Sequence, residues 1–107
     1  MNELSFKNLR ETNVRRCNDA FRPLEDWSPT DWGCAMAGEA GEACNLLKKM
    51  LRGEDVPLEH VAEELADVVT YVDLLAARLG IDLGAAVVRK FNIVSRKRGS
   101  KIFLGEA

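Results

Sequence analysis

The sequence contains few of the nitrogen and sulfur residues that build metal, redox or disulfide sites. Its 107 residues include one histidine, His60, and three cysteines, Cys17, Cys34 and Cys44. An odd number of cysteines without a C-x-x-C pair argues against a disulfide framework and against a zinc site. A lone histidine lacks the two Glu-x-x-His motifs of a di-iron bundle. Any metal chemistry must therefore rest on oxygen ligands.

The sequence has no excess of positive charge and no long apolar run. The formal net charge is -2, so there is no overall basic field that would attract nucleic acid. No apolar run approaches the roughly 20 residues that a bilayer crossing needs. The first residues, MNELSFKNLRE, are polar and charged, which argues against a signal peptide. We therefore expect a cytoplasmic protein with neither a nucleic-acid partner nor a membrane partner.

Apolar residues recur at helical spacing through most of the chain, and no strand pattern or repeat is present. Helices are predicted over residues 4–21, 29–51, 58–79 and 83–98. Ser28 and Pro29 form a strong helix start, and Asp82 can cap the last helix. Gly53 and Gly80 follow predicted helix ends, where a left-handed residue is common.

The length allows one domain with its own core. We predict an all-α fold, a compact bundle of about four helices that occupies residues 1–107 as a single domain. Its core spans residues 27–98, and residues 99–107 form a C-terminal tail.

Four carboxylates lie inside the predicted apolar stripes of the second and third helices. Glu39 and Glu42 occur in GEAGEACNLLKK, and Glu64 and Asp67 occur in EELADVV. The i, i+3 spacing places each pair on one side of its helix. The stripes are Trp32, Ala35, Met36, Ala43, Leu46 and Met50, and then Val61, Leu65, Val68, Tyr71, Leu74 and Leu75. Four such acids facing a core would cost several kcal/mol per uncompensated ion. A divalent cation offsets that cost, and oxygen ligands favour Mg²⁺, with Mn²⁺ as a substitute.

Cations and an amide near these acids are candidates for binding phosphate. Lys48 follows the first acidic pair by less than two turns, and Lys90, Asn92 and Arg96 lie on the last predicted helix. A metal with basic residues at its edge is the minimum apparatus for a polyphosphate. An exposed basic run is otherwise an ordinary solvated helix face.

Three aromatic residues have two interpretations. Trp27, Trp32 and Tyr71 either stack on a nucleobase or pack in the core, as most aromatic side chains of small domains do. Tyr71 lies one turn after Asp67 on the same face, and Trp27 precedes the acidic helix, where it can cover the mouth of a pocket.

The motif order resembles that of the MazG-like all-α nucleoside triphosphate pyrophosphohydrolases. GEAGEACNLLKK is followed by EELADVVTYVDLLAARLGIDL and then by KFN, and the resemblance covers residues 27–98. That family's signature is ExxE, a loop and ExxD, with a basic residue and an asparagine on the following helix. The matching positions are Glu39, Glu42, Glu64, Asp67, Lys90 and Asn92.

The resemblance implies a magnesium-dependent hydrolase that cleaves a nucleoside triphosphate between the α- and β-phosphates. Glu39 or Glu42 would act as the general base on the attacking water. Trp27 and Tyr71 would contact the base, by analogy with deoxycytidine triphosphate hydrolases. The family further implies a dimer or tetramer whose site is completed at or near a subunit interface. A role in nucleotide house-cleaning or pool control would follow.

Two other functions remain open from the sequence. The same superfamily includes the phosphoribosyl-ATP pyrophosphohydrolases of histidine biosynthesis. Alternatively, the chain is a non-catalytic helical interaction module whose acids hold a structural cation or a basic partner. The base and sugar preference, the number of metal ions and the identity of the general base are not fixed by these patterns.

Overall fold

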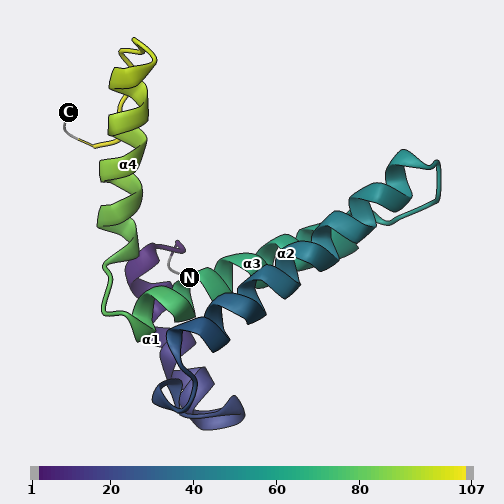
Figure 1. Ribbon diagram of the computed structural model, residues 1–107, viewed down its shortest axis with the longest axis horizontal. Helices are drawn as coiled ribbons and strands as arrows, with labels where there is room; N and C mark the ends of the chain where they lie inside the picture. Colours follow the sequence, from purple (N-terminus) through teal and green to yellow (C-terminus); the bar gives the residue numbers. More distant parts are fainter. Residues whose placement is uncertain (1–2, 106–107) are drawn as a thin grey trace.

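Helices make up nearly all the regular structure in the computed structural model, which describes residues 3–105 (Figure 1). The elements in chain order are α1 (Phe6–Arg16), a π-helical turn (Cys17–Phe21), a 3₁₀ turn (Leu24–Asp26), α2 (Pro29–Leu51), α3 (Leu58–Arg78) and α4 (Leu83–Lys97). No strand occurs within residues 3–105. The prediction of an all-α fold with about four helices is confirmed.

The long helices α2 and α3 lie side by side as an antiparallel hairpin (Figure 1). The start of α2 is fixed locally by a capping box in which Ser28 Oγ accepts from the Asp31 backbone N–H at 3.1 Å. Asp31 Oδ2 in turn accepts from the Ser28 backbone N–H at 3.0 Å. At the far end of α2, Gly53 adopts φ 85°, a left-handed conformation that ends the helix without a side-chain clash.

The hydrophobic core lies at the end of the hairpin where α1 crosses α3. Cys17, Leu24, Trp32 and Leu74 are buried there, and Tyr71 packs against them. No other element within residues 3–105 covers the opposite half of the hairpin. Two residues of the predicted stripes, Met50 and Leu65, are therefore 37% and 53% exposed rather than buried.

Helix α4 stands apart from the hairpin (Figure 1). Its N-cap is Asp82, whose Oδ1 accepts from the Ala85 N–H at 3.0 Å. It meets α1 at Gly84, where a methyl group would lie 3.3 Å from Cβ of Phe6. The residues after α4 fold back along it, and Asn92 bonds both the N–H and the C=O of Leu104. None of the helices in residues 3–105 combines the length and apolar content of a membrane span.

Candidate functional site

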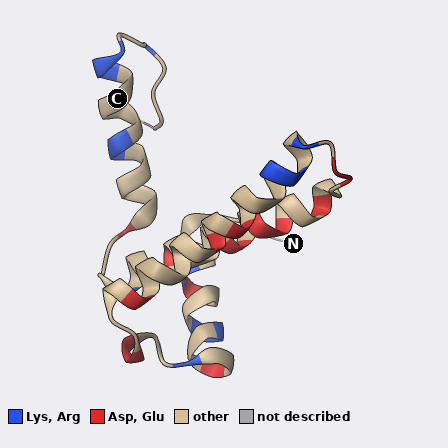
Figure 2. Ribbon diagram, turned by 45° about the vertical axis from the view of Figure 1, so that its right-hand side comes forward, with Lys and Arg blue, Asp and Glu red and all other residues tan. Residues whose placement is uncertain are grey.

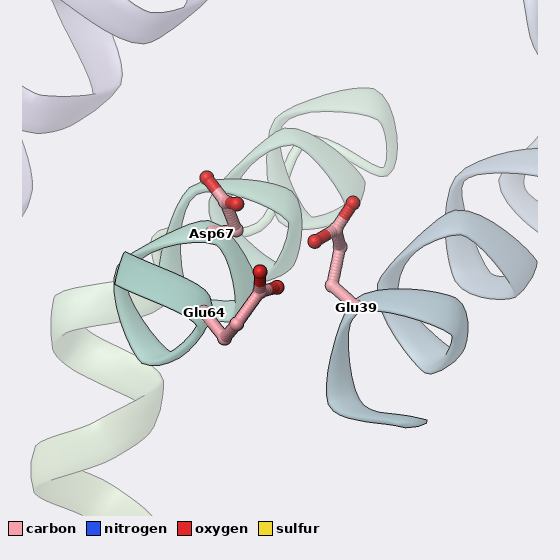
Figure 3. A group of neighbouring side chains, drawn as sticks. All are labelled: Glu39, Glu64 and Asp67. Carbon is pink, nitrogen blue, oxygen red and sulfur yellow. The ribbon is translucent and has the colours of Figure 1, made fainter. Parts of the chain in front are cut away.

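Three of the four predicted acids converge in the middle of the α2–α3 hairpin. Glu39 reaches from α2 toward Glu64 and Asp67 of α3 (Figure 3). One carboxylate oxygen from each residue lies within 4.8 Å of the other two. Glu39 and Glu64 are half-buried and Asp67 is exposed, so the group is open to solvent on one side. The segments that carry acidic residues gather along this part of the hairpin (Figure 2).

The acids at this position have no compensating charge among the described residues. Glu39 Oε2 and Glu64 Oε2 are buried without a hydrogen-bond partner. The ion pairs of residues 3–105 are Arg10–Asp73, Arg52–Glu54 and Arg78–Glu25, and none of them includes these acids. A buried carboxylate oxygen without a partner is costly, and such exceptions are rare in folded proteins.

The pKa values of Glu39 and Glu64 are raised by burial and by the neighbouring acids. Burial raises the pKa of Glu39 above its usual 4.5, and the charges of Glu42 and Asp67 raise it further. The neighbouring Glu42 side chain is the largest cause that raises the pKa of Glu64, and burial and the charges of Asp67 and Glu63 raise it further. Glu42, although exposed, therefore belongs to the same group, and the fold brings all four predicted acids together.

The arrangement fits a divalent cation. Its donors are carboxylate oxygens alone, which Mg²⁺ and Mn²⁺ prefer. A cation held by Glu39, Glu64 and Asp67 would partner the two buried oxygens and favour the ionised form of each acid. The observation that supports the fit is the pair of unsatisfied oxygens, because a purely structural acidic face would leave its oxygens in water.

A cavity of about 440 Å³ adjoins the acids, within the size range of small-molecule sites. Glu39 and Asp67 form part of its wall, so the acids lie at its edge. The rest of the lining comes from α1, the π-helical turn, the following loop and the buried faces of α2 and α3. These residues are Asn13, Arg16, Cys17, Ala20, Phe21, Arg22, Trp27, Trp32, Thr70, Tyr71 and Leu74.

Three aromatic residues, Trp27, Trp32 and Tyr71, join the core to the cavity wall. Trp32 is 2% exposed, and its Nε1 donates to the Leu24 carbonyl at 3.1 Å, so it packs in the core. Trp27 contacts it with ring centroids 4.7 Å apart, and the Tyr71 ring centroid lies 6.2 Å from that of Trp32. Burial raises the pKa of Tyr71, as do the charges of Glu39 and Asp67, so its hydroxyl keeps its proton.

Comparison with known proteins identifies relatives of the chain. No family model matches it. It is 35% identical over 96 residues to human dCTP pyrophosphatase 1, covering 79% of this chain and 56% of that protein. It is 31% identical over 106 residues to the bovine protein of the same name, covering 89% of this chain and 63% of that protein. The gene 37 protein of Mycobacterium phage L5 is 32% identical over 75 residues, which are 65% of this chain and 66% of the phage protein.

The chain belongs to the MazG-like all-α nucleoside triphosphate pyrophosphohydrolase family. It spans a little over half to about two thirds of the length of the curated relatives it matches.

The other predicted phosphate-binding groups of this MazG-like chain lie away from the acids. Lys48 is exposed near the hairpin tip and does not line the cavity. Lys90 and Arg96 are exposed on α4, and the Arg96 guanidinium lies 5.5 Å from the ring of Phe103. Asn92 is 5% exposed and bonded to the tail. A single chain does not bring α4 to the acids, so the substrate-binding roles of these residues stay predictions.

The N-terminal segment also contributes to the site, which the sequence patterns did not predict. Asn13 and Cys17 lie on one face of α1 and its π-helical extension, and both line the cavity. Arg22 also lines it, with its guanidinium 4.1 Å from the centre of the Trp27 ring. The available signal was Asn13 itself, a polar residue spaced four from Leu9 and four from Cys17 within an apolar row.

Proposed function

We propose that this protein is a magnesium-dependent nucleoside triphosphate pyrophosphohydrolase that converts a nucleotide, such as a deoxynucleoside triphosphate, to its monophosphate and pyrophosphate. One observation carries the proposal: two buried, unpartnered carboxylate oxygens, those of Glu39 and Glu64, stand at the edge of an aromatic cavity. A cation-binding group next to a base-sized cavity matches the two ends of a nucleotide. The named activity of the dCTP pyrophosphatase relatives agrees with it.

In this proposal the cavity holds the base and the acids hold the phosphates through a cation. Trp27 and Tyr71 present partly buried rings to the cavity, and stacking on such rings suits any base. Tyr71 keeps its hydroxyl proton and remains a hydrogen-bond donor. Glu39 and Asp67 belong to both the cavity wall and the acidic cluster. The sugar would therefore lie near these two residues, between the base in the cavity and the phosphates at the acids.

Glu39, Glu64 and Asp67 would hold the ion, with Glu42 beside them. The bound cation would supply positive charge that offsets the phosphate oxygens during displacement at phosphorus. Glu39 or Glu42 would take the proton from the attacking water at a carboxylate oxygen.

A second copy of the chain would complete the site. α4 exposes an apolar face made of Val87, Val88, Phe91 and Val94, which are 37–43% exposed. Lys90 and Arg96 lie on the same helix, away from the acids of their own chain. Packing of α4 from one copy on the hairpin of another would cover the apolar face and deliver cations to the phosphates. The family resemblance implies such a dimer or tetramer in a cytoplasmic enzyme.

The assembly is tested by Phe91→Asp, with Lys101→Asp, at an exposed tail position, as control. We expect the Phe91 variant to be a helical monomer in light scattering and to lose most of its activity. A wild-type protein that is monomeric and fully active would contradict the proposed assembly. It would not contradict the proposed metal site.

The function is tested by pyrophosphate release from a panel of ribo- and deoxynucleoside triphosphates, in Mg²⁺ and in EDTA. Glu42→Gln is the site variant and Glu59→Gln, an exposed acid at the start of α3, is the control. Metal-dependent formation of monophosphate and pyrophosphate, lost only in Glu42→Gln, is the expected result. Release of a diphosphate and phosphate would contradict cleavage between the α- and β-phosphates. Silence across the panel would point to phosphoribosyl-ATP or, if that is also inert, to an interaction module.

A further inference from the structure

The cavity contains one amide whose orientation is set by an ion pair behind it. Asn13 is 4% exposed, and its Nδ2 donates to the Thr70 carbonyl at 2.9 Å and to Asp73 Oδ2 at 3.1 Å. Asp73 is fully buried, and its other oxygen accepts from Arg10 Nε at 2.9 Å. Arg10 is fixed in turn, because its Nη2 donates to the Ile81 carbonyl at 2.9 Å.

This network leaves only one orientation for the Asn13 amide. Both neighbours of its nitrogen are acceptors, a backbone carbonyl and a carboxylate. A flipped amide would place its oxygen against these two acceptors, which repels. Both amide protons are therefore committed to α3. No hydrogen bond within residues 3–105 reaches the amide oxygen, which is left for a ligand in the cavity that Asn13 lines.

The amide is bonded to α3 on the C-terminal side of Asp67. Its partners Thr70 and Asp73 follow Asp67 on α3 by about one and two turns, or about 4.5 and 9 Å along the axis. A nucleotide with its phosphates at Asp67 would point the far edge of its base toward Asn13. In cytosine and adenine the group on that far edge is an exocyclic amine, whereas in uracil and hypoxanthine it is a carbonyl oxygen.

We propose that Asn13 is a specificity residue that selects bases with an exocyclic amine over their oxo counterparts, and that Asp73 positions it. This inference rests on the proposed nucleotide hydrolase function. The locked amide offers an acceptor and cannot turn to offer a donor. It bonds an amine but faces a carbonyl as acceptor against acceptor, which leaves both groups unsatisfied in a buried place. Donation from the amide to the Asp73 carboxylate also strengthens the amide oxygen as an acceptor.

The two cationic groups in the cavity lining, Arg16 and Arg22, are placed differently from Asn13. Arg16 and Arg22 are exposed, and their guanidinium groups lie over the rings of Phe21 and Trp27. They are donors at the solvent-exposed rim, whereas Asn13 is fixed at the inner wall. Discrimination at the far edge of the base therefore falls to Asn13.

The first test compares kcat/KM within two matched pairs, dCTP with dUTP and dATP with dITP, in the intact protein with Mg²⁺. We expect the amino member of each pair to be favoured by about tenfold to a hundredfold, the usual effect of one unsatisfied buried group. Asn13→Ala should bring both ratios close to one. Equal rates in the wild type, or preference for the oxo members, would overturn the proposal.

Two further variants separate positioning from stability. Asn18→Ala removes an asparagine of the neighbouring turn whose oxygen accepts from the Leu24 N–H outside the cavity, and we expect it to keep the wild-type ratios. Asp73→Asn keeps the shape but replaces the acceptor that locks Asn13. Its ratios should fall toward one in the protein that remains folded by circular dichroism. Unchanged ratios in Asp73→Asn would overturn the positioning role.

A binding measurement separates failure of this inference from failure of the hydrolase proposal. Quenching of tryptophan fluorescence, from Trp27 and Trp32 in the cavity wall, reports binding of deoxycytidine and deoxyuridine in EDTA, without turnover. Tighter binding of deoxycytidine in the wild type, lost in Asn13→Ala, supports the inference even if no triphosphate is hydrolysed. Equal binding of both nucleosides contradicts it even if hydrolysis is efficient.

Discussion

Helix α3 carries two acids with buried carboxylate oxygens, and the fold gives these oxygens opposite surroundings. Asp73 is fully buried, and its two oxygens accept from Arg10 and Asn13. Glu64, on the same helix about two and a half turns earlier, has a buried oxygen with no partner and is surrounded by other acids. The first acid is completed by its own chain, and the second is left for something that the described residues do not provide.

The difference indicates how a buried acid should be interpreted. A carboxylate with its own cation and amide holds elements together, as Asp73 joins α3 to α1. A carboxylate with unfilled oxygens among like charges weakens the fold and persists because a ligand completes it. Asp73 therefore contributes to the stability of the fold, whereas Glu64 contributes to ligand binding, and the two effects can be measured separately.

The largest effect is expected from Glu64→Gln. We expect turnover to fall at least about a hundredfold, more than the loss usually seen for outer partners of metal ligands. The rise in melting temperature caused by Mg²⁺ should disappear. In EDTA, however, the variant should be more stable than the wild type, because a neutral amide removes repulsion from Asp67 and the other acids. Pyrophosphate assays and thermal melts with and without Mg²⁺ measure these effects, and a loss of stability in EDTA would contradict the interpretation.

Asp73→Ala should show the opposite pattern. Removing one partner of a buried ion pair costs about 3 kcal/mol of unfolding free energy, because Arg10 and Asn13 are left without their acceptor. Urea denaturation in EDTA measures the loss. Glu54→Ala is the control, since the Arg52–Glu54 pair is exposed and should change stability by less than about 1 kcal/mol. Equal losses in the two variants would show that the buried network adds nothing.

The pH dependence of stability in the metal-free protein tests the acidic cluster by itself. The pKa values of Glu39 and Glu64 are raised above 4.5 in the folded state. The folded protein therefore binds more protons than the unfolded chain between 4.5 and the raised values. Their contribution to stability is fully present below that window and is lost as the pH rises through it. Melting in EDTA should show a loss on the alkaline side that Mg²⁺ reverses and Glu64→Gln reduces. A stability that rises across this window would contradict the shifts.

The smallest effect is expected from Gly41→Ala on α2. No atom lies within 4 Å of the position that the added methyl group would take. Alanine should therefore stabilise the helix by about 1 kcal/mol, measured by urea denaturation. The same variant examines the assembly: a gain in stability accompanied by a loss of oligomer would show that a second copy approaches α2 closely at this glycine.

The sequence predicted the features that are encoded within a few residues. The bounds of α2, Pro29 to Leu51, were predicted correctly because Ser28, Pro29 and Gly53 determine both ends locally. The convergence of the acids was also predictable, since i, i+3 spacing on two neighbouring helices fixes which way they face.

The parts that the sequence did not reveal depend on contacts between distant residues. The Asn13–Asp73 hydrogen bond joins positions 60 residues apart, and nothing near Asn13 indicates its partner. The direction of α4 depends on how the Gly80–Asp82 turn meets α1, so the separation of Lys90 from the acids was not foreseeable. Leu65 has helical periodicity but is 53% exposed, because no element within residues 3–105 covers that half of the hairpin.

The π-helical turn after α1 makes the cavity sensitive to chain length. The Arg22 N–H donates to the Cys17 carbonyl at 2.9 Å, a span one residue longer than in an α-helix. Deleting one residue between these two would allow a regular helical turn and rotate the next residues by about 100°. Phe21 and Arg22 would then leave the cavity wall although neither had been substituted. Insertions and deletions in this turn, more than exchanges of side chains, would therefore reshape the pocket.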